Sequence, residues 1–309
     1  TRVGAHEGNH VIYMHWSPAS CADCAALTYL IEGETAIDLR RVDGEPTTLE
    51  NRIVASGRPF YFSWSPDGRT MLWHRGGAQR FNPGAALTRY DLTTGRSAEI
   101  DLAPGSHLAP AFSPDGRAWL AVGERNGRNA LVVGAGPTRR VIASGAAEYA
   151  FAWSPDGARI AYAGRSAADA PAYGPIQLYS LADGVTTQIT QRGFHPRAFF
   201  WSPDGSRLAY INWLAIPDAH WSQWRVYDVA AGMERGYAAF NPSPQMRMVI
   251  GSFNQYGQSH RLWSADGRYL LYADRDRELI ERIWLVDTAA TSNTDSVFVA
   301  EGSFGVWAP

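Results

Sequence analysis

Five residues near the amino terminus form a possible metal-binding motif, His-Glu-Gly-Asn-His at 6–10. The pattern H-E-x-x-H binds zinc when both histidines lie on one face of a helix, with the glutamate acting as general base. Gly8 and Asn9 disfavour a helix, and the segment leads into a run with the composition of a β-strand. We therefore expect no zinc-protease site here, and the sequence predicts neither a metal nor another cofactor.

The two cysteines, Cys21 and Cys24, form a C-x-x-C pair. Such a pair can be a disulfide, a redox centre or half of a metal site. A zinc site needs four ligands, and no second C-x-x-C exists. A redox pair should open a helix in a βαβ unit, which this stretch does not resemble. We expect a loop disulfide in an oxidising compartment, with two free thiols as the alternative.

Aspartate recurs in a repeated turn, Ser-Pro-Asp-Gly, which becomes Ser-Ala-Asp-Gly in its last copy. The aspartates of the five copies are Asp67, Asp115, Asp156, Asp204 and Asp266. One catalytic centre does not need five copies of its carboxylate. A turn does need these residue types, because Pro presets φ, Asp accepts hydrogen bonds from nearby amides and Gly adopts a positive φ. The sequence therefore predicts that these aspartates are structural.

The residue before each turn is aromatic, and it recurs at a regular spacing. The aromatic positions are Trp16, Trp64, Phe112, Trp153, Trp201, Trp263 and Trp307. A period of 40–50 residues is typical of propellers and solenoids. The segments after the turns, such as 159–164, 207–212 and 268–273, are short, aromatic and β-branched, as strands are. We expect each large ring to lie between neighbouring sheets, with its N–H bonded to an acceptor.

These patterns predict an all-β chain, a six-bladed β-propeller of four-stranded antiparallel blades in one domain, 1–309. The expected blades are 10–56, 57–104, 105–145, 146–192, 193–252 and 253–300. The tail, 301–309, matches the approach to Trp64 in spacing and looks like a seventh first strand. It would either close the ring or begin a further blade, so seven blades are the alternative.

On these W-S-P-D-G turns the chain resembles the TolB-like family of WD-like propeller repeats, over about residues 10–307. The resemblance implies six-bladed propellers, commonly outside the cytoplasm, that bind proteins or peptides. Similar blades also precede the hydrolase domain of prolyl oligopeptidase relatives. That hydrolase half would carry G-x-S-x-G, which this sequence lacks.

Composition excludes several other functions. The net charge is −2, which gives no electrostatic reason to bind nucleic acid or an anionic membrane. All 28 basic residues are Arg, so chemistry that depends on lysine is ruled out. No apolar stretch is long enough to span a membrane. The chain begins at Thr1, as it would after removal of a signal peptide or anchor, or after trimming.

The connections between blades supply a candidate binding site, because they meet at one mouth of a propeller's channel. The residues expected there are His10, Arg58, His107, Glu148, His195, Arg197, Tyr256 and His260. The arginines could bind a carboxylate or a chain terminus, and two or three histidines could hold a metal. The alternative is a set of solvated loop residues.

The fifth blade contains two apparent insertions, at 213–222 before its third strand and at 232–245 between its third and fourth strands. The first is rich in tryptophan, with Trp213, Trp221 and then Trp224. Tryptophan on a long loop could anchor a partner, since it contributes strongly to interface energies. The alternative is that these rings pack over an enlarged blade.

The function expected from the sequence is that of a non-catalytic, extracytoplasmic binding module. It would dock a protein or peptide at the channel mouth and the blade 5 loops, as a periplasmic, secreted or membrane-anchored part of a cell-envelope assembly. Whether the chain is an enzyme stays open. The alternative function is a propeller hydrolase or lyase that uses His107, His195 or His260 as base or metal ligand.

Overall fold

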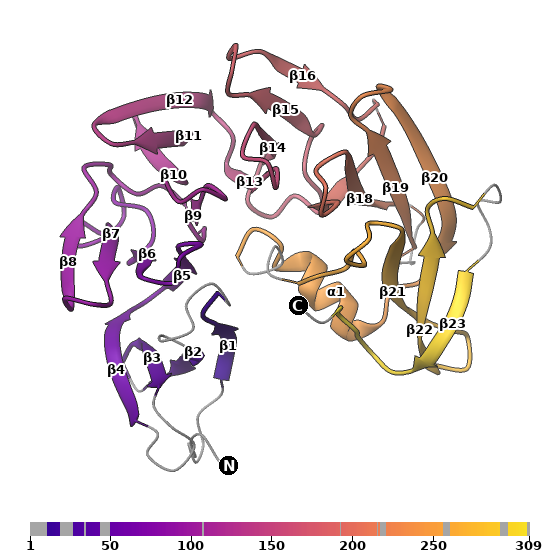
Figure 1. The fold of residues 1–309 in the computed structure, drawn as a ribbon, viewed down its shortest axis with the longest axis horizontal. Helices are drawn as coiled ribbons and strands as arrows, with labels where there is room; N and C mark the ends of the chain where they lie inside the picture. Colours follow the sequence, from indigo (N-terminus) through magenta and orange to yellow (C-terminus); the bar gives the residue numbers. More distant parts are fainter. Residues whose placement is uncertain are drawn as a thin grey trace. The chain divides into compact units, whose positions relative to one another are not determined.

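The computed structural model describes residues 11–18, 27–33, 35–43, 50–106, 108–191, 193–214, 216, 221–255, 260–290 and 296–307. Among them are 23 β-strands and one α-helix (Figure 1). The chain forms two compact units, Thr1–Ala147 and Glu148–Pro309. The expectation of a single domain remains a prediction. His10, Cys21, Cys24, His107 and Tyr256 lie outside the described residues.

The first unit contains three antiparallel sheets, each built from four strands that are consecutive in sequence. The first sheet contains β1 (Val11–Trp16), β2 (Leu27–Glu32), β3 (Ile37–Asp43) and β4 (Glu50–Gly57). The second contains β5 (Phe60–Trp64), β6 (Thr70–Arg75), β7 (Ala86–Asp91) and β8 (Arg96–Glu99). The third contains β9 (Ala111–Phe112), β10 (Ala118–Arg125), β11 (Arg128–Ala135) and β12 (Thr138–Ser144).

The second unit also contains three antiparallel sheets with consecutive strands. The fourth sheet contains β13 (Glu148–Trp153), β14 (Arg159–Arg165), β15 (Gln177–Ser180) and β16 (Thr186–Gln188). The fifth contains β17 (Pro196–Trp201), β18 (Arg207–Trp213), β19 (Ser222–Asp228) and β20 (Met233–Phe240). The sixth contains β21 (Tyr269–Arg275), β22 (Glu281–Asp287) and β23 (Ser296–Glu301), and an isolated bridge between Trp263 and Leu270 stands where its first strand was expected.

The repeated turns are structural, as predicted. In all five, the serine hydroxyl donates to the aspartate Oδ1 at 2.5–2.6 Å. The same oxygen accepts the backbone N–H two residues further on at 2.9–3.1 Å. The glycine has a φ of 68–71°, a region that suits glycine best. Each turn thereby connects the first strand of a sheet to the second.

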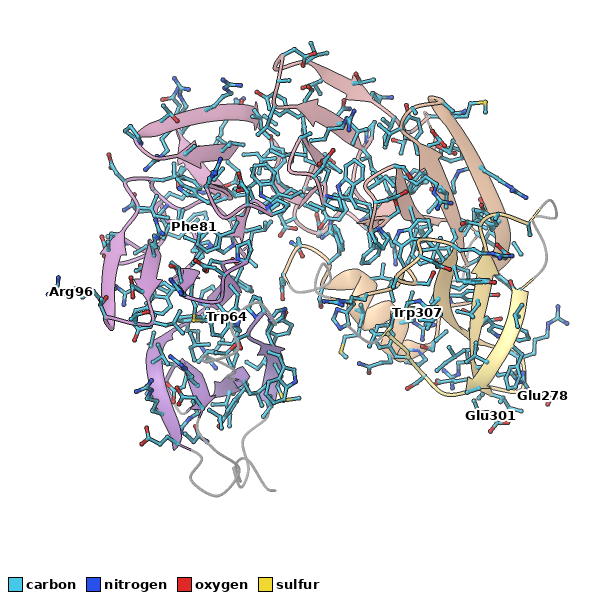
Figure 2. All side chains as sticks on the ribbon, in the orientation of Figure 1. Trp64, Phe81, Arg96, Glu278, Glu301 and Trp307 are labelled. Atoms are coloured by element: carbon cyan, nitrogen blue, oxygen red, sulfur yellow. The ribbon has the colours of Figure 1, made fainter. Side chains whose placement is uncertain are left out.

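Four of the motif tryptophans link neighbouring sheets through their indole N–H groups, whereas the buried indole N–H of Trp153 has no hydrogen-bond partner among the described residues. For three of the four, all in the second unit, the acceptor is the carbonyl of the residue just before the motif aromatic of the preceding sheet. These pairs are Trp201 with Ala152 (3.3 Å), Trp263 with Phe200 (3.0 Å) and Trp307 with Leu262 (3.2 Å). In the first unit, Trp64 reaches the equivalent carbonyl, that of His15, through the hydroxyl of Thr28. Figure 2 labels Trp64 and Trp307.

The tail follows the same rule, because the backbone N–H of Trp307 also bonds to the carbonyl of Arg261 at 2.9 Å. Trp307 therefore sits against the sixth sheet as the other motif tryptophans sit against theirs. Residues 302–307 form no strand, so the expected seventh first strand stays a prediction. The number of blades in a closed ring stays a prediction.

The second predicted insertion of the fifth blade is wrong. Residues 233–240 form β20, the fourth strand, which follows β19 after a tight turn closed by a bond from Gly232 N–H to the Asp228 carbonyl. The additional residues of the fifth repeat follow β20 and include helix α1 (Pro244–Gly251). The Ser243 hydroxyl caps this helix by accepting a hydrogen bond from the Met246 N–H. The proline at the start of this segment suits the first turn of a helix, which composition alone did not reveal.

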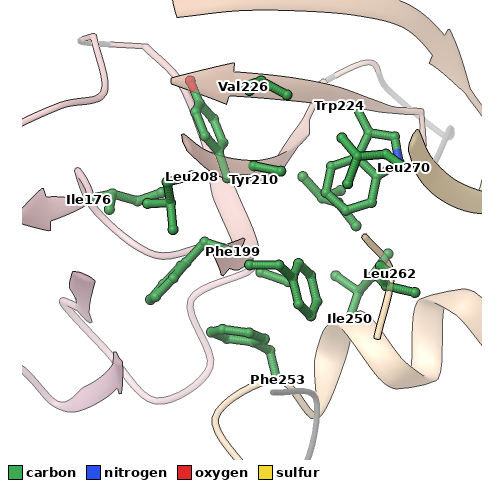
Figure 3. Packing of buried hydrophobic residues seen from close by; sticks show 14 of the residues in the cluster. Ile176, Phe199, Leu208, Tyr210, Trp224, Val226, Ile250, Phe253, Leu262 and Leu270 are labelled. Atoms are coloured by element: carbon green, nitrogen blue, oxygen red, sulfur yellow. The ribbon is translucent and has the colours of Figure 1, made fainter. Parts of the chain in front are cut away.

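The helix completes a large hydrophobic core in the second unit. Met246 and Ile250 of α1 are buried with Phe199, Phe253 and Trp224. Figure 3 shows this packing, with Phe253 below Phe199 and Trp224 near Leu270. In the described part of the chain, no helix is long and apolar enough to cross a membrane.

Candidate functional site

The candidate site lies at one end of the fourth and fifth sheets, where the first strands begin and the second strands end. Glu148 begins β13 and pairs in register with Arg165, the last residue of β14. Arg197 is the second residue of β17, and Trp213 ends β18. Because consecutive strands are antiparallel, the start of one lies beside the end of the next. The two sheets thus present these side chains at equivalent places.

Arg165 is held by two partners. Its Nη1 lies 3.2 Å from Glu148 Oε2, and both side chains are largely buried. Its guanidinium also stacks over the ring of Tyr173, 4.2 Å from the ring centre. A cation over an aromatic face is stabilised by the ring's quadrupole, more so when water is excluded. Arg165 is therefore fixed in one orientation.

Tyr173 connects the two sheets. It lies between β14 and β15, and its backbone N–H donates to the carbonyl of Pro196, the residue before Arg197, at 2.8 Å. The side chain is 3% exposed, and its hydroxyl has no hydrogen-bond partner among the described residues. Burial raises the pKa of Tyr173, so the phenol stays protonated and is available as a donor.

Arg197 has no carboxylate partner in the part of the chain that the structure describes. Its guanidinium stacks on the ring of Trp213, 4.7 Å from the centre, and its buried Nε has no acceptor. Burial, and then the positive charge of Arg165, lower the pKa of Arg197. The bond from the Tyr173 N–H to the Pro196 carbonyl brings the ring that supports Arg165 to the strand of Arg197. Both arginines remain charged, since arginine does not lose its proton in proteins.

His195 borders the same group. Its backbone N–H donates to Asn212 Oδ1 at 2.6 Å, and its carbonyl accepts from the Trp213 N–H at 2.9 Å. The imidazole meets the Trp213 ring edge to face, with centres 6.1 Å apart. His195 and Arg197 thus both contact the ring of Trp213.

Two other expected residues contact different partners. Arg58 belongs to the first unit, where it forms a half-exposed ion pair with Glu32 at 2.6 Å. His260 packs edge to face on Phe304 of the tail, with ring centres 5.3 Å apart. Nothing described brings either of them to the group of Glu148, His195 and Arg197. The expectation for these two therefore remains a prediction.

The three tryptophans of the fifth sheet have different environments. Trp213 supports Arg197. Trp221 lies opposite Leu214, whose backbone N–H bonds to the Trp221 carbonyl at 2.9 Å. The side chain of Trp221 is 39% exposed. Trp224 is 0% exposed in the core and meets Phe200 edge to face. The prediction that Trp224 binds a partner is therefore wrong, because its position on β19 points it inward.

Sequence reasoning missed Arg165 and Tyr173. The signal for Arg165 was the antiparallel register, since a residue paired with Glu148 must lie at the same end of the sheet. Tyr173 lies in an irregular connection, whose path no pattern in the sequence predicts.

The chemistry of the group is that of a hydrogen-bond donor site. Glu148 pairs with the guanidinium of Arg165. The Nε of Arg197, the Tyr173 phenol and the Trp213 indole N–H have no acceptor in the described part of the chain. Among the described residues, no group of histidines, cysteines and carboxylates could hold a metal ion. The arrangement suits an anion with several acceptor oxygens.

No protein-family model matches the chain, and no curated protein does. Solved structures do. TolB from Acinetobacter baumannii is 18% identical, with a TM-score of 0.51, over 85% of this chain and 61% of that one. An oligogalacturonate lyase in complex with manganese is 15% identical, with a TM-score of 0.61, over 89% of this chain and 74% of that one. A chain of the mitotic checkpoint complex is 13% identical, with a TM-score of 0.55, over 99% of this chain and 90% of that one.

The fold is that of a β-propeller, as these similarities show. More particularly, it is a TolB-like propeller fold, as the repeated motif predicted. The chain spans less than two thirds of the length of the TolB chain.

Proposed function

We propose that this chain is a non-catalytic binding module that docks a protein or peptide partner. The docking site is the group of Glu148, Arg165, Arg197 and Trp213, with Trp221 at its border. The observation that carries the proposal is the position of Arg197, a cation with no carboxylate partner among the described residues, stacked on Trp213 where β18 ends.

Two further features support a partner of this kind. Trp221 exposes part of a large, stiff ring, and tryptophan and arginine are the residues that contribute most to protein interfaces. Glu148 and Arg165 are paired in register, and Arg165 and Arg197 each stack on an aromatic ring, so these side chains are held in place before binding. A site organised in advance loses less entropy when it binds.

We further propose that the protein acts outside the cytoplasm, in an envelope assembly. The resemblance of the repeats to TolB-like propellers supports this location. The Cys21–Cys24 pair, as a disulfide, would be consistent with it.

Site-specific photo-crosslinking tests the proposal. A photoreactive phenylalanine analogue replaces Trp221 and, as a matched control, Phe81, which is 80% exposed in the first unit. In cells of the source organism, we expect a discrete crosslinked partner from position 221 and none from position 81. Arg197→Gln in the same protein should abolish the product. Equal products from both positions, or no product at 221, would contradict the proposal.

A second candidate function is a lyase or hydrolase at the same site. The observation that favours it is His195, whose imidazole meets the same Trp213 ring as Arg197 and makes no hydrogen bond to a described residue, so it could act as a base. The similarity to an oligogalacturonate lyase suggests an assay substrate. Formation of an unsaturated product, followed by ultraviolet absorbance with and without added manganese and lost in His195→Ala, would support catalysis. No turnover under either condition would remove this candidate.

A further inference from the structure

Four buried hydrogen-bond donors of the site have no acceptor among the described residues. They are Arg165 Nε, Tyr173 Oη, Arg197 Nε and Trp213 Nε1. Buried polar groups without partners are rare in native proteins, because each one loses its hydrogen bonds to water. Four in one place, from two adjacent sheets, indicate a site whose acceptors come from another molecule.

The charges point the same way. Arg165 and Arg197 contribute two positive charges. Among the described residues, the carboxylate that pairs with this arginine couple is Glu148, which binds Arg165. Glu148 bonds to Arg165 through Nη1, which leaves the Nε of that guanidinium without an acceptor. Counted over the described residues, the site is therefore one negative charge short of neutrality and rich in donors.

The geometry further limits the position of a ligand. Tyr173 lies under Arg165 and Trp213 under Arg197, so each guanidinium has one face covered by an aromatic ring. The bond from the Tyr173 N–H to the Pro196 carbonyl ties the two stacks together. The guanidinium edges, where the N–H donors lie, are the parts that can meet a planar acceptor.

We infer that this site binds a single carboxylate of the partner, gripped by Arg197 with Arg165 and supplied by a chain terminus or an acidic side chain. A carboxylate carries the one missing charge and offers about four lone-pair positions to the four donors. Its planar shape matches the fork of a guanidinium, which allows two parallel bonds. A phosphate dianion would exceed the charge that the site lacks. This inference rests on the proposed function and adds the chemistry of the ligand.

The test uses small carboxylates and the indole N–H signals of the ¹⁵N-labelled whole chain. Trp213 is assigned by comparison with Trp213→Phe. N-acetylglycine represents a chain terminus, propionate an acidic side chain, N-acetylglycinamide the neutral control and methyl phosphate the dianion. At constant ionic strength, we expect a saturable shift of the Trp213 signal with N-acetylglycine or propionate and none with the amide. The tighter of the two carboxylates identifies the source.

Two variants check the residues. Arg197→Gln should weaken carboxylate binding at least about tenfold, because a charge-assisted bond is lost. Arg275→Gln is the matched control, since Arg275 ends β21 as Arg165 ends β14, carries a buried Nε without an acceptor and pairs with Glu281. Its effect should be less than about twofold, because Arg275 belongs to the sixth sheet and not to the proposed site.

The inference is wrong if the Trp213 signal of the wild-type chain shows no saturable shift with either carboxylate, or an equal shift with the amide. It is also wrong if methyl phosphate binds more tightly than the carboxylates, or if Arg197→Gln and Arg275→Gln weaken carboxylate binding equally. The comparison of acid with amide needs no variant and holds even where Arg197→Gln fails to fold. Partner crosslinking at position 221 without carboxylate binding refutes the inference and leaves the proposed function standing. Carboxylate binding without any crosslinked partner refutes the proposed function instead.

Discussion

The indole N–H of Trp263 bonds to the carbonyl oxygen of Phe200 at 3.0 Å and so links the sixth sheet of the chain to the fifth. Phe200 directly precedes Trp201, whose own indole bonds to Ala152 in the fourth sheet. A bond that recurs with the repeat explains why the motif keeps an aromatic residue at this place. The ring fills the space between two sheets, and its N–H satisfies a carbonyl that faces that space.

Replacing Trp263 with Phe should lower the free energy of unfolding by about 1–2 kcal/mol, because the carbonyl of Phe200 loses its donor in a buried place. Urea unfolding followed by circular dichroism measures the change. Trp307→Phe is the matched comparison, since it removes the same kind of bond at a half-buried site and should cost less. Equal stability of Trp263→Phe and the wild type would contradict the linking role.

Replacing Asp156 with Ala should also lower stability by about 1–2 kcal/mol. The substitution removes the bonds from the Ser154 hydroxyl and the Ala158 N–H that close the turn. Partner crosslinking from position 221 should be unchanged, because Asp156 lies in a turn and not in the proposed site. Loss of crosslinking at full stability would show that the aspartate has a functional role.

Stability should fall in acid as the turn aspartates become protonated. The hydrogen bond from Ser202 is the largest cause that lowers the pKa of Asp204 to about 2, against 3.8 for a free side chain. A carboxylate whose pKa is lower in the folded state contributes stability above pH 3.8, and that contribution is lost as the pH falls through about 2. Between these values, Asp204→Asn should show a flatter dependence of unfolding free energy on pH than the wild type.

The control for this acid effect is Asp169→Asn, at an exposed residue between β14 and β15. This substitution removes a carboxylate that lies outside the repeated turns. Urea unfolding at several pH values from 2 to 5 makes the comparison. Identical curves for Asp204→Asn and the wild type would contradict the stabilising role of the turn carboxylate.

Trp221 and Trp224 should respond oppositely to replacement by Ala. Trp221→Ala should weaken partner binding about tenfold or more, with little change in melting temperature, because the ring is partly exposed. Trp224→Ala should cost about 3–5 kcal/mol of stability, because it leaves a cavity in the core. Binding of the crosslinked partner and thermal unfolding separate the two effects. A large drop in melting temperature for Trp221→Ala would show that its ring is part of the core.

Most of the fold could be predicted from local sequence patterns. Ser202, Asp204 and Gly205 form their turn through bonds within a few residues, so the motif could be recognised from its letters, and so could the alternation of the strands. Helix α1 was missed, because its buried Met246 and Ile250 gain their stability from packing against other sheets rather than from helix propensity.

By itself, the sequence determined the repeated turn, the strands around it, the all-β class and the aromatic residue that links one sheet to the next. It could do so because these features depend on bonds between neighbours in the chain or on a bond that recurs with the repeat. Only the tertiary structure decided that Arg165 and Tyr173 join Arg197, and that Trp224 lies inside while Trp221 remains partly exposed. Those outcomes depend on strand register and on the path of an irregular connection, which join residues far apart in sequence and leave no local pattern.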